Sequence, residues 1–346
     1  MKQTIITIML TLVWVTGQAQ NADSVLGWLW EISGNGLSHK SWLFGTCHGD
    51  GISFTDEEIY GSISGLSDAL DEVKAVFFET DMRAKEMSDE EKEEMKRLMG
   101  KIYRPGPEYM MPEGVFYKPL YDSVAHFNEV NKFMTYKMKD AEYWKKTPGY
   151  WCIRLGLYAL SKARMCRFVD TALYEEATKR GKEIGGLETQ AFGMGKIMPM
   201  YTDTESIDTL SMKEQAKIIY TFVHLYDNDS IFQNPKLHKV YLENDTCKLQ
   251  RFFAEGAHKR NEMMEALGRK GEEAKTAMEE AEDYQSEHLL RERNEAWMPV
   301  IKENISVRTC LIAVGCRHLL SADGLIAMLR REGYTVEAVK KKQKKH

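Results

Sequence analysis

Residues 41–48 read SWLFGTCH, a short apolar run that ends in Gly-Thr-Cys-His. Residues 307–318 read VRTCLIAVGCRH, and this second apolar run ends in Gly-Cys-Arg-His. Apolar runs of this length, closed by a glycine, are typical of buried β-strands. The sequence thus predicts two strands near opposite ends of a 346-residue chain, each followed by a Gly-x-x-His turn.

The segments around these turns predict an α/β fold whose mixed sheet is built from both chain ends. Strand-like runs alternate there with turn signals and with helix-like segments. Thr55 is followed by acidic residues, a pattern typical of the N-terminal cap of a helix. The cluster Gly34-Asn35-Gly36 predicts a hairpin turn between the first two strands. The expected elements are strands at 25–32 and 41–46, a helix from Thr55 to Glu72, strands at 73–78 and 307–314, a helix at 319–332 and a strand at 335–339.

Between these parts the pattern is mostly helical. Only residues 181–187 (GKEIGGL) predict a strand there. We expect one domain over residues 20–339, with sheet parts at about 25–80 and 305–339 and a large helical insertion at about 82–304. A basic tail follows at 340–346. The expected helices of the insertion lie at 88–100, 117–138, 160–180, 212–226 and 252–304.

The N-terminus predicts export. Lys2 precedes an apolar stretch from Thr4 to Val15, and small residues end at Ala19, as in a secretory signal peptide cleaved near that residue. The apolar stretch is shorter than the roughly 20 residues of a membrane span. We therefore expect residues 1–19 to be removed and the mature chain, without a membrane span, to be periplasmic or secreted.

Composition and motifs exclude several classes of protein. With 43% hydrophobic and 29% charged residues, the chain is neither disordered nor collagen-like. A net charge of −5 gives no field that attracts nucleic acid. The sequence has no phosphate-binding glycine loop and no Gly-x-Ser-x-Gly elbow, which disfavours nucleotide-binding and serine-hydrolase functions.

The six cysteines predict no disulfide framework. Cys152 and Cys166, if on one helix, would lie about 21 Å apart along its axis, too far to bridge. Cys47, Cys310 and Cys316 lie in or beside strands, and we expect them to be small buried residues.

Three predicted strands end in a residue that can bind metal or move protons. His48 and His318 each follow a strand by a Gly-x-x-His turn, and Glu79 ends the strand at 73–78. Ligand sites of open α/β sheets gather outside the carboxyl ends of the strands. Each residue alone could be structural, but together they predict one site assembled from distant parts of the sequence.

The chain resembles the TraB/GumN family over about residues 26–339. The resemblance rests on short motifs that occur in order along the sequence. These are LWEI at 29–32, SWLFGTCH at 41–48, FFE at 77–79, DTAL at 170–173, GLET at 186–189, RN at 293–294, AVGCRHL at 313–319, GL at 324–325 and GYTV at 333–336.

The resemblance implies an α/β fold shared with erythromycin esterases and the haem-binding ChaN proteins, and kinship with the Tiki membrane proteases. The Tiki activity is metal-dependent peptide hydrolysis supported by Mn or Co. Carried over to this chain, the implied site consists of His48, His318 and Glu79. The resemblance further implies a divalent ion (Mn, Co or Zn) as the cofactor and a peptide or protein as the substrate.

Two imidazoles and one carboxylate suit a divalent transition ion. Such an ion would lower the pKa of a water molecule and polarise the scissile carbonyl. Glu79 is then either the third ligand or the general base. Arg293 or Arg317 could stabilise the developing oxyanion.

Further candidates have structural alternatives. Glu188 and the pair Arg293-Asn294 either line the pocket or support the fold, and Asp170 is expected to be structural. The sequence has no His-Glu-x-x-His motif. The spacings His258…Glu262 and His288…Glu292 predict surface ion pairs on helices.

Two other functions compete with a metal-dependent hydrolase. One is a protein that holds haem or metal without turnover, which haemin titration would reveal by a Soret band. The other is a protein that sequesters a peptide, for which alanine at His48 would leave peptide binding unchanged.

Overall fold

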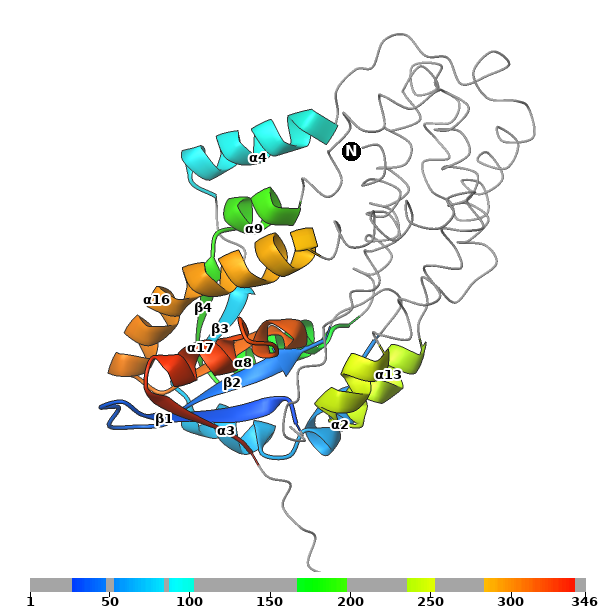
Figure 1. Cartoon of the computed structure of the whole chain (residues 1–346), viewed down its shortest axis with the longest axis vertical. Helices are drawn as coiled ribbons and strands as arrows, with labels where there is room; N and C mark the ends of the chain where they lie inside the picture. The colour runs from blue at the N-terminus through cyan, green and yellow to red at the C-terminus, as the bar shows by residue number, and fades with distance from the viewer. Residues whose placement is uncertain are drawn as a thin grey trace, which may run out of the picture.

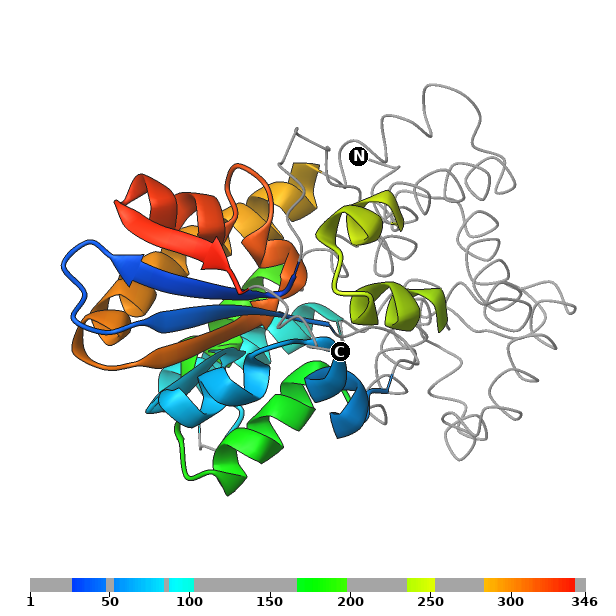
Figure 2. The same ribbon diagram turned by 90° about the horizontal axis from the view of Figure 1, so that it is seen from below.

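The computed structural model describes residues 27–47, 53–83, 87–102, 167–197, 235–252 and 283–339. Its centre is a six-stranded mixed sheet, which confirms the predicted α/β class (Figures 1 and 2). Across the sheet the order is β4-β3-β5-β2-β1-β6. The strands are β1 (Leu29–Gly34), β2 (Ser41–Thr46), β3 (Ala75–Thr80), β4 (Glu183–Glu188), β5 (Cys310–Gly315) and β6 (Tyr334–Ala338).

The four strands β4, β3, β5 and β2 are parallel neighbours, whereas β1 is antiparallel to both β2 and β6. The β1–β2 pair is the expected hairpin. Its turn residues Gly34, Asn35 and Gly36 have φ angles of 75°, 46° and 80°, which glycine and asparagine adopt more easily than other residues. Because β2 to β5 are parallel, their carboxyl ends meet at one edge of the sheet.

Helices cover both faces of the sheet (Figure 2). On one face α16 (Glu292–Val307) and α17 (Leu325–Arg331) pack on the apolar side chains of the strands. On the other face the core includes residues of α2 (Asp56–Ser62), α3 (Leu66–Glu72), α8 (Val169–Lys179) and α13 (Pro235–Leu242). In the central strand β5, every residue from Cys310 to Val314 is buried, as expected for a strand covered on both faces.

The remaining described elements lie around the carboxyl edge. Helix α4 (Asp89–Ile102) packs against α9 (Gln190–Ile197) (Figure 1). A π-helix, η1 (Gln285–Arg291), continues directly into α16. A short 3₁₀-helix, η2 (Cys316–Leu319), follows β5.

The sheet contains strands from both chain ends, as predicted, and one strand from between them. The segment at 181–187 was expected to be a short strand, and it forms the edge strand β4, which is parallel to β3. Thus the long middle part of the chain is not only an insertion beside the sheet: it also supplies one strand.

Several predicted boundaries were wrong. The strand at 307–314 begins only at Cys310, because Val307 is the last residue of α16 and is 71% exposed. The helix expected from Thr55 to Glu72 is two helices, since Gly65 adopts a φ of 83° between them. Of the helix expected at 319–332, only Leu325–Arg331 (α17) is α-helical, because η2 ends at Leu319 and residues 320–324 form turns and bends.

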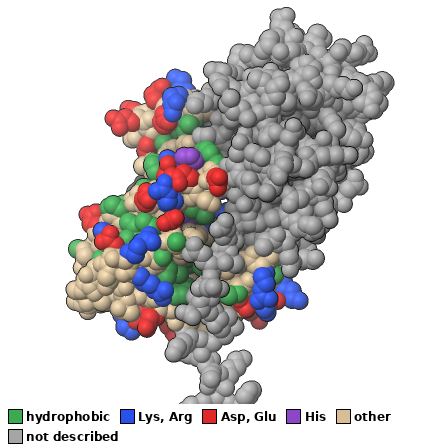
Figure 3. Space-filling view, viewed as in Figure 1, with side chains coloured by type: hydrophobic (Ala, Val, Ile, Leu, Met, Phe, Trp, Pro, Cys, Tyr) green, Lys and Arg blue, Asp and Glu red, His purple; other side chains and the backbone are tan. Residues whose placement is uncertain are grey.

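Other predictions concern residues outside those that the structure describes. They include the signal peptide, the helices at 117–138 and 212–226, Cys152, Cys166, His258 and the basic tail. Within the described ranges no helix is long and apolar enough to cross a membrane. On the face seen in Figure 3, acidic and basic side chains are interspersed. Cys47, Cys310 and Cys316 are buried free thiols, as predicted.

Candidate functional site

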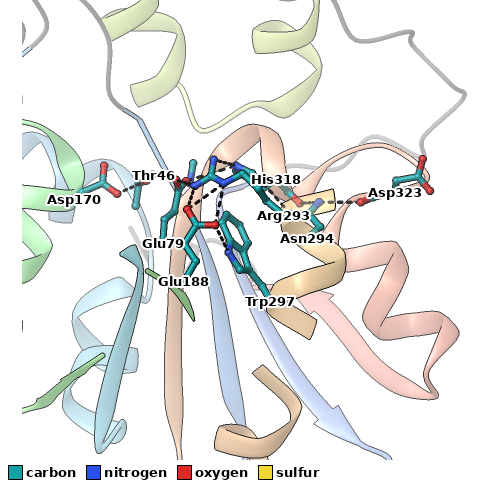
Figure 4. A network of polar contacts seen from close by, with 10 residues as sticks. Thr46, Glu79, Asp170, Glu188, Arg293, Asn294, Trp297, His318 and Asp323 are labelled. Atoms are coloured by element: carbon teal, nitrogen blue, oxygen red, sulfur yellow. Dashed lines mark hydrogen bonds and ion pairs between the residues drawn. The ribbon is translucent and has the colours of Figure 1, made fainter. Parts of the chain in front are cut away.

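Polar side chains from four elements meet at the carboxyl edge of the sheet (Figure 4). Glu79 lies near the end of β3, and Glu188 ends β4. His318 lies in η2, directly after β5, and Arg293 lies in the first turn of α16. We call these four side chains the edge cluster.

Arg293 is the centre of the edge cluster. Its Nε lies 3.1 Å from each carboxylate oxygen of Glu188, and its Nη2 lies 2.5 Å from Glu188 Oε1. The same Nη2 donates to Glu79 Oε2 at 2.7 Å. The side chain of Arg293 is 7% exposed and that of Glu188 is 3% exposed. Charges this deeply buried are tolerated only when they are paired, so the two carboxylates and the guanidinium depend on one another.

Asn294 fixes the tautomer of His318. The amide nitrogen of Asn294 donates to the backbone oxygens of His318 (3.2 Å) and Asp323 (2.8 Å). The amide oxygen therefore faces His318 Nδ1, at 2.8 Å. Because an amide oxygen only accepts, Nδ1 of His318 carries the hydrogen, and Nε2 of the neutral ring carries the lone pair.

The Nε2 atom of His318 faces both charged partners of the edge cluster. It lies 3.4 Å from Arg293 Nη1 and 3.7 Å from Glu79 Oε1. Its ring also packs at 4.5 Å from the ring of Trp297. The proton-accepting nitrogen is thus held between a guanidinium and a carboxylate.

Glu79 connects the strand ends to the helix. Its Oε1 accepts a hydrogen bond of 2.8 Å from the backbone N–H of Gly315, the first residue of the second Gly-x-x-His turn. Its Oε2 accepts from Arg293. At 21% exposure, the side chain of Glu79 is the most accessible of the edge cluster, so it is the carboxylate most open to solvent.

Burial shifts the pKa values of the inner ion pair. Burial raises the pKa of Glu188 above its usual value, although the hydrogen bonds from Arg293 and Trp297 oppose the shift. Burial alone would lower the pKa of Arg293, but Glu79 and Glu188 raise it. The guanidinium therefore remains charged at every accessible pH.

Two residues that the sequence analysis did not single out support Glu188. Trp297 Nε1 donates to Glu188 Oε2 at 2.8 Å, and the Trp297 ring lies 4.7 Å from the guanidinium carbon of Arg293. Gly193 leaves room for the carboxylate, because a Cβ there would lie 2.5 Å from Glu188 Oε1. Trp297 could have been found from its spacing, since it lies four residues after Arg293 and hence on the same helix face.

The end of β2, which precedes His48, is held by buried contacts. Thr46 donates to Asp170 at 2.7 Å, and Tyr241 donates to the backbone oxygen of Gly45 at 2.7 Å. Gly45 allows η2 to approach, because a Cβ there would lie 3.0 Å from Cys316 Cβ. The glycine of the first turn thus serves close packing between the two Gly-x-x-His segments.

The predicted site residues have different outcomes. The structure brings Glu79, Glu188, Arg293 and His318 together, with Asn294 behind His318. His48 lies outside the described residues. Arg317 precedes His318 in η2, where it counteracts the burial that raises the pKa of Cys316 to about 12.

Two further predictions concern polar pairs. Asp170 holds Thr46, which agrees with the structural role expected for it. The surface pair is confirmed for His288 and Glu292, whose Nδ1 and Oε2 atoms lie 3.0 Å apart.

The edge cluster fits a divalent metal ion in the kind of donor it offers. His318 presents Nε2, and its other nitrogen donates to Asn294, the usual arrangement behind a metal-binding histidine. Glu79 adds a carboxylate beside Nε2. Among the described residues no group of three or more His, Cys, Asp or Glu forms a complete metal site. A third ligand would therefore have to come from elsewhere, and His48 is the residue that the sequence analysis predicts.

Comparison with known proteins identifies the family. Neither the curated proteins nor the solved structures include a significant match. A profile described as the TraB/PrgY/gumN family matches residues 28–338, which include every strand of the sheet and the whole edge cluster. The chain belongs to the TraB/PrgY/gumN family.

Proposed function

We propose that this protein is an exported, metal-dependent hydrolase that acts on peptides or proteins. The observation that carries the proposal is the fixed tautomer of His318, whose Nε2 lies 3.7 Å from Glu79 Oε1 at the carboxyl edge of the sheet. An imidazole whose Nε2 lies beside a partly exposed carboxylate suits both metal binding and proton transfer.

In this proposal His318, Glu79 and His48 hold the ion, which is Mn, Co or Zn. The ion supplies Lewis acidity that polarises a scissile carbonyl. We assign to Glu79 the role of third ligand, because it is the most accessible carboxylate of the edge cluster and lies beside His318 Nε2. Asn294 keeps the His318 ring in the required tautomer.

Arg293 supplies fixed positive charge to the proposed site. A charge that does not reorient during the reaction stabilises an oxyanion more effectively than water does. Glu188 and Trp297 hold the guanidinium from the other side, so these two residues position Arg293 rather than touch the substrate.

Export is part of the proposal. It rests on the signal-like residues 1–19, with Lys2 before an apolar stretch and small residues up to Ala19. We therefore place the mature chain in the periplasm or outside the cell. Mass spectrometry of the mature protein, with a first residue near Gln20, would support this placement.

Metal content of the purified mature protein tests the proposal. After incubation with Mn, Co or Zn and removal of free ion, we expect about one ion per chain. His48→Ala and His318→Ala should lose the ion and remain folded by circular dichroism. His288→Ala is a matched control, because His288 pairs with Glu292 on a surface helix, and it should keep the ion.

Peptide cleavage by the loaded protein, followed by mass spectrometry on a mixed peptide library, tests the substrate class. Loss of cleavage in Glu79→Gln with retention in His288→Ala would support the assignment. If the parent protein binds no ion, or if His318→Ala binds it equally well, the metal-dependent function is wrong. Haem binding and peptide sequestration would then be the functions to test.

A further inference from the structure

Arg293 contacts both groups of the edge cluster that would hold a metal ion. Its Nη2 donates to Glu79 Oε2 at 2.7 Å, and its Nη1 lies 3.4 Å from His318 Nε2. A guanidinium has only donor hydrogens and a permanent positive charge. It therefore faces the same lone pairs and the same negative charge that a divalent ion requires.

We propose that Arg293 is an internal competitor of the metal ion: a divalent ion binds only when the guanidinium withdraws from Glu79 and His318. This inference rests on the proposed function, and it concerns how occupancy of that site is controlled. In the metal-free state the guanidinium neutralises the site. In the metal-bound state it moves away from the ion but stays within the protein.

Electrostatics require this exchange. Like charges about 4 Å apart repel one another, and a divalent ion repels the guanidinium twice as strongly as a single positive charge would. Arg293 is 7% exposed, so solvent screens the repulsion only weakly. The single lone pair of His318 Nε2 can serve only one of them, and their like charges oppose simultaneous short contacts with Glu79.

The edge cluster also contains a second set of partners that makes the exchange feasible. Nε and Nη2 of Arg293 contact Glu188, and Trp297 lies against the guanidinium face. Glu188 is nearly fully buried and is fixed by Trp297, so it cannot follow the ion. An Arg293 side chain that leaves Glu79 therefore stays paired with Glu188, and no unpaired charge is left buried.

Binding of Mn²⁺, measured by titration calorimetry at one fixed pH, tests the competition. The informative variant is the double substitution Arg293→Gln with Glu188→Gln. It removes one positive and one negative charge together, so the net charge of the edge cluster does not change. We expect the double variant to bind Mn²⁺ at least tenfold more tightly than the parent, since Glu79 and His318 no longer contact a guanidinium.

A matched control comes from the same helical segment. Arg291 and Glu287 form an exposed pair in η1, and Arg291→Gln with Glu287→Gln makes the same chemical change outside the edge cluster. This control should bind Mn²⁺ with the affinity of the parent. If the double variant of the edge cluster does not fold, Arg293→Lys serves instead. An ammonium cannot contact Glu79, Glu188 and His318 at once, so this variant should also bind more tightly.

The outcomes separate this inference from the proposed function. Equal or weaker Mn²⁺ affinity in the edge-cluster variants, with parent binding that His318→Ala abolishes, would overturn the competition and leave the metal function standing. Absence of Mn²⁺, Co²⁺ and Zn²⁺ binding in the parent and in the variants would overturn both. Binding in the double variant that exceeds parent binding at least tenfold supports the competition.

Discussion

Replacing Arg293 with methionine should lower the free energy of unfolding by about 3–5 kcal/mol at neutral pH, the usual cost of removing one partner from a buried ion pair. The structure justifies this value, which is larger than the loss expected for an ion pair exposed on the surface. Arg293 is 7% exposed and contacts two carboxylates, of which Glu188 is 3% exposed. Loss of the contact with the Trp297 ring adds to the effect.

Urea denaturation followed by circular dichroism measures this change. An unchanged slope of the unfolding free energy against urea concentration would show that the substitution does not alter the denatured state. Adding Glu188→Gln to Arg293→Met should recover part of the loss, because the amide removes the uncompensated charge and keeps an oxygen for Trp297. Arg291→Met, in an exposed pair, should change stability little. The reasoning is refuted if Arg293→Met is as stable as Arg291→Met, or if the double variant is no more stable than Arg293→Met.

Three more predictions follow from the same cluster. Gly193→Ala should destabilise the protein by about 1–3 kcal/mol in the urea assay, because the added methyl group must displace the Glu188 carboxylate. The control is Gly195→Ala in the same helix, where the methyl group meets open space; this change should be neutral or slightly stabilising. Asn294→Ala should weaken Mn²⁺ binding about 10- to 100-fold in calorimetry while the fold persists, since His318 Nδ1 loses its acceptor. An unchanged affinity would contradict the role of Asn294 in fixing the tautomer of His318. Burial raises the pKa of Glu188 in the folded state, so the folded protein binds more protons at this group than the unfolded chain does. The stability that Glu188 contributes is therefore present below the unfolded pKa and is lost as pH rises through the folded pKa. In Glu188→Gln this decline should be absent from the acid part of the stability–pH curve, and a curve identical to that of the parent would show that the shift has no energetic effect.

The fold was predictable wherever one local signal determined the structure. The capping box of Thr55 and Glu58 forms as the sequence predicts, and the glycine-rich hairpin turn forms between β1 and β2. The end of α16 was not predictable in the same way. Val307 is β-branched and stands before an apolar run, so it favours a strand locally, yet it is the last residue of α16, whose Ile301 and Ile305 pack on the sheet.

The edge cluster was predictable in its residues but not in its connections. The strand-end pattern indicated Glu79 and His318 without any contact information. The pairing of Arg293 with Glu188 joins residues 105 positions apart, and it depends on the edge position of β4, which no local pattern encodes. The role of Trp297 depends on that same packing.

The place of β5 in the sheet has a consequence for biogenesis. This strand lies between β2 and β3, yet it is synthesised some 230 residues after β3. Until residues 310–315 have been synthesised, β2 and β3 have no strand between them, and Glu79 lacks the hydrogen bond that the backbone N–H of Gly315 donates to it. The edge cluster is therefore completed only after nearly the whole chain has been synthesised.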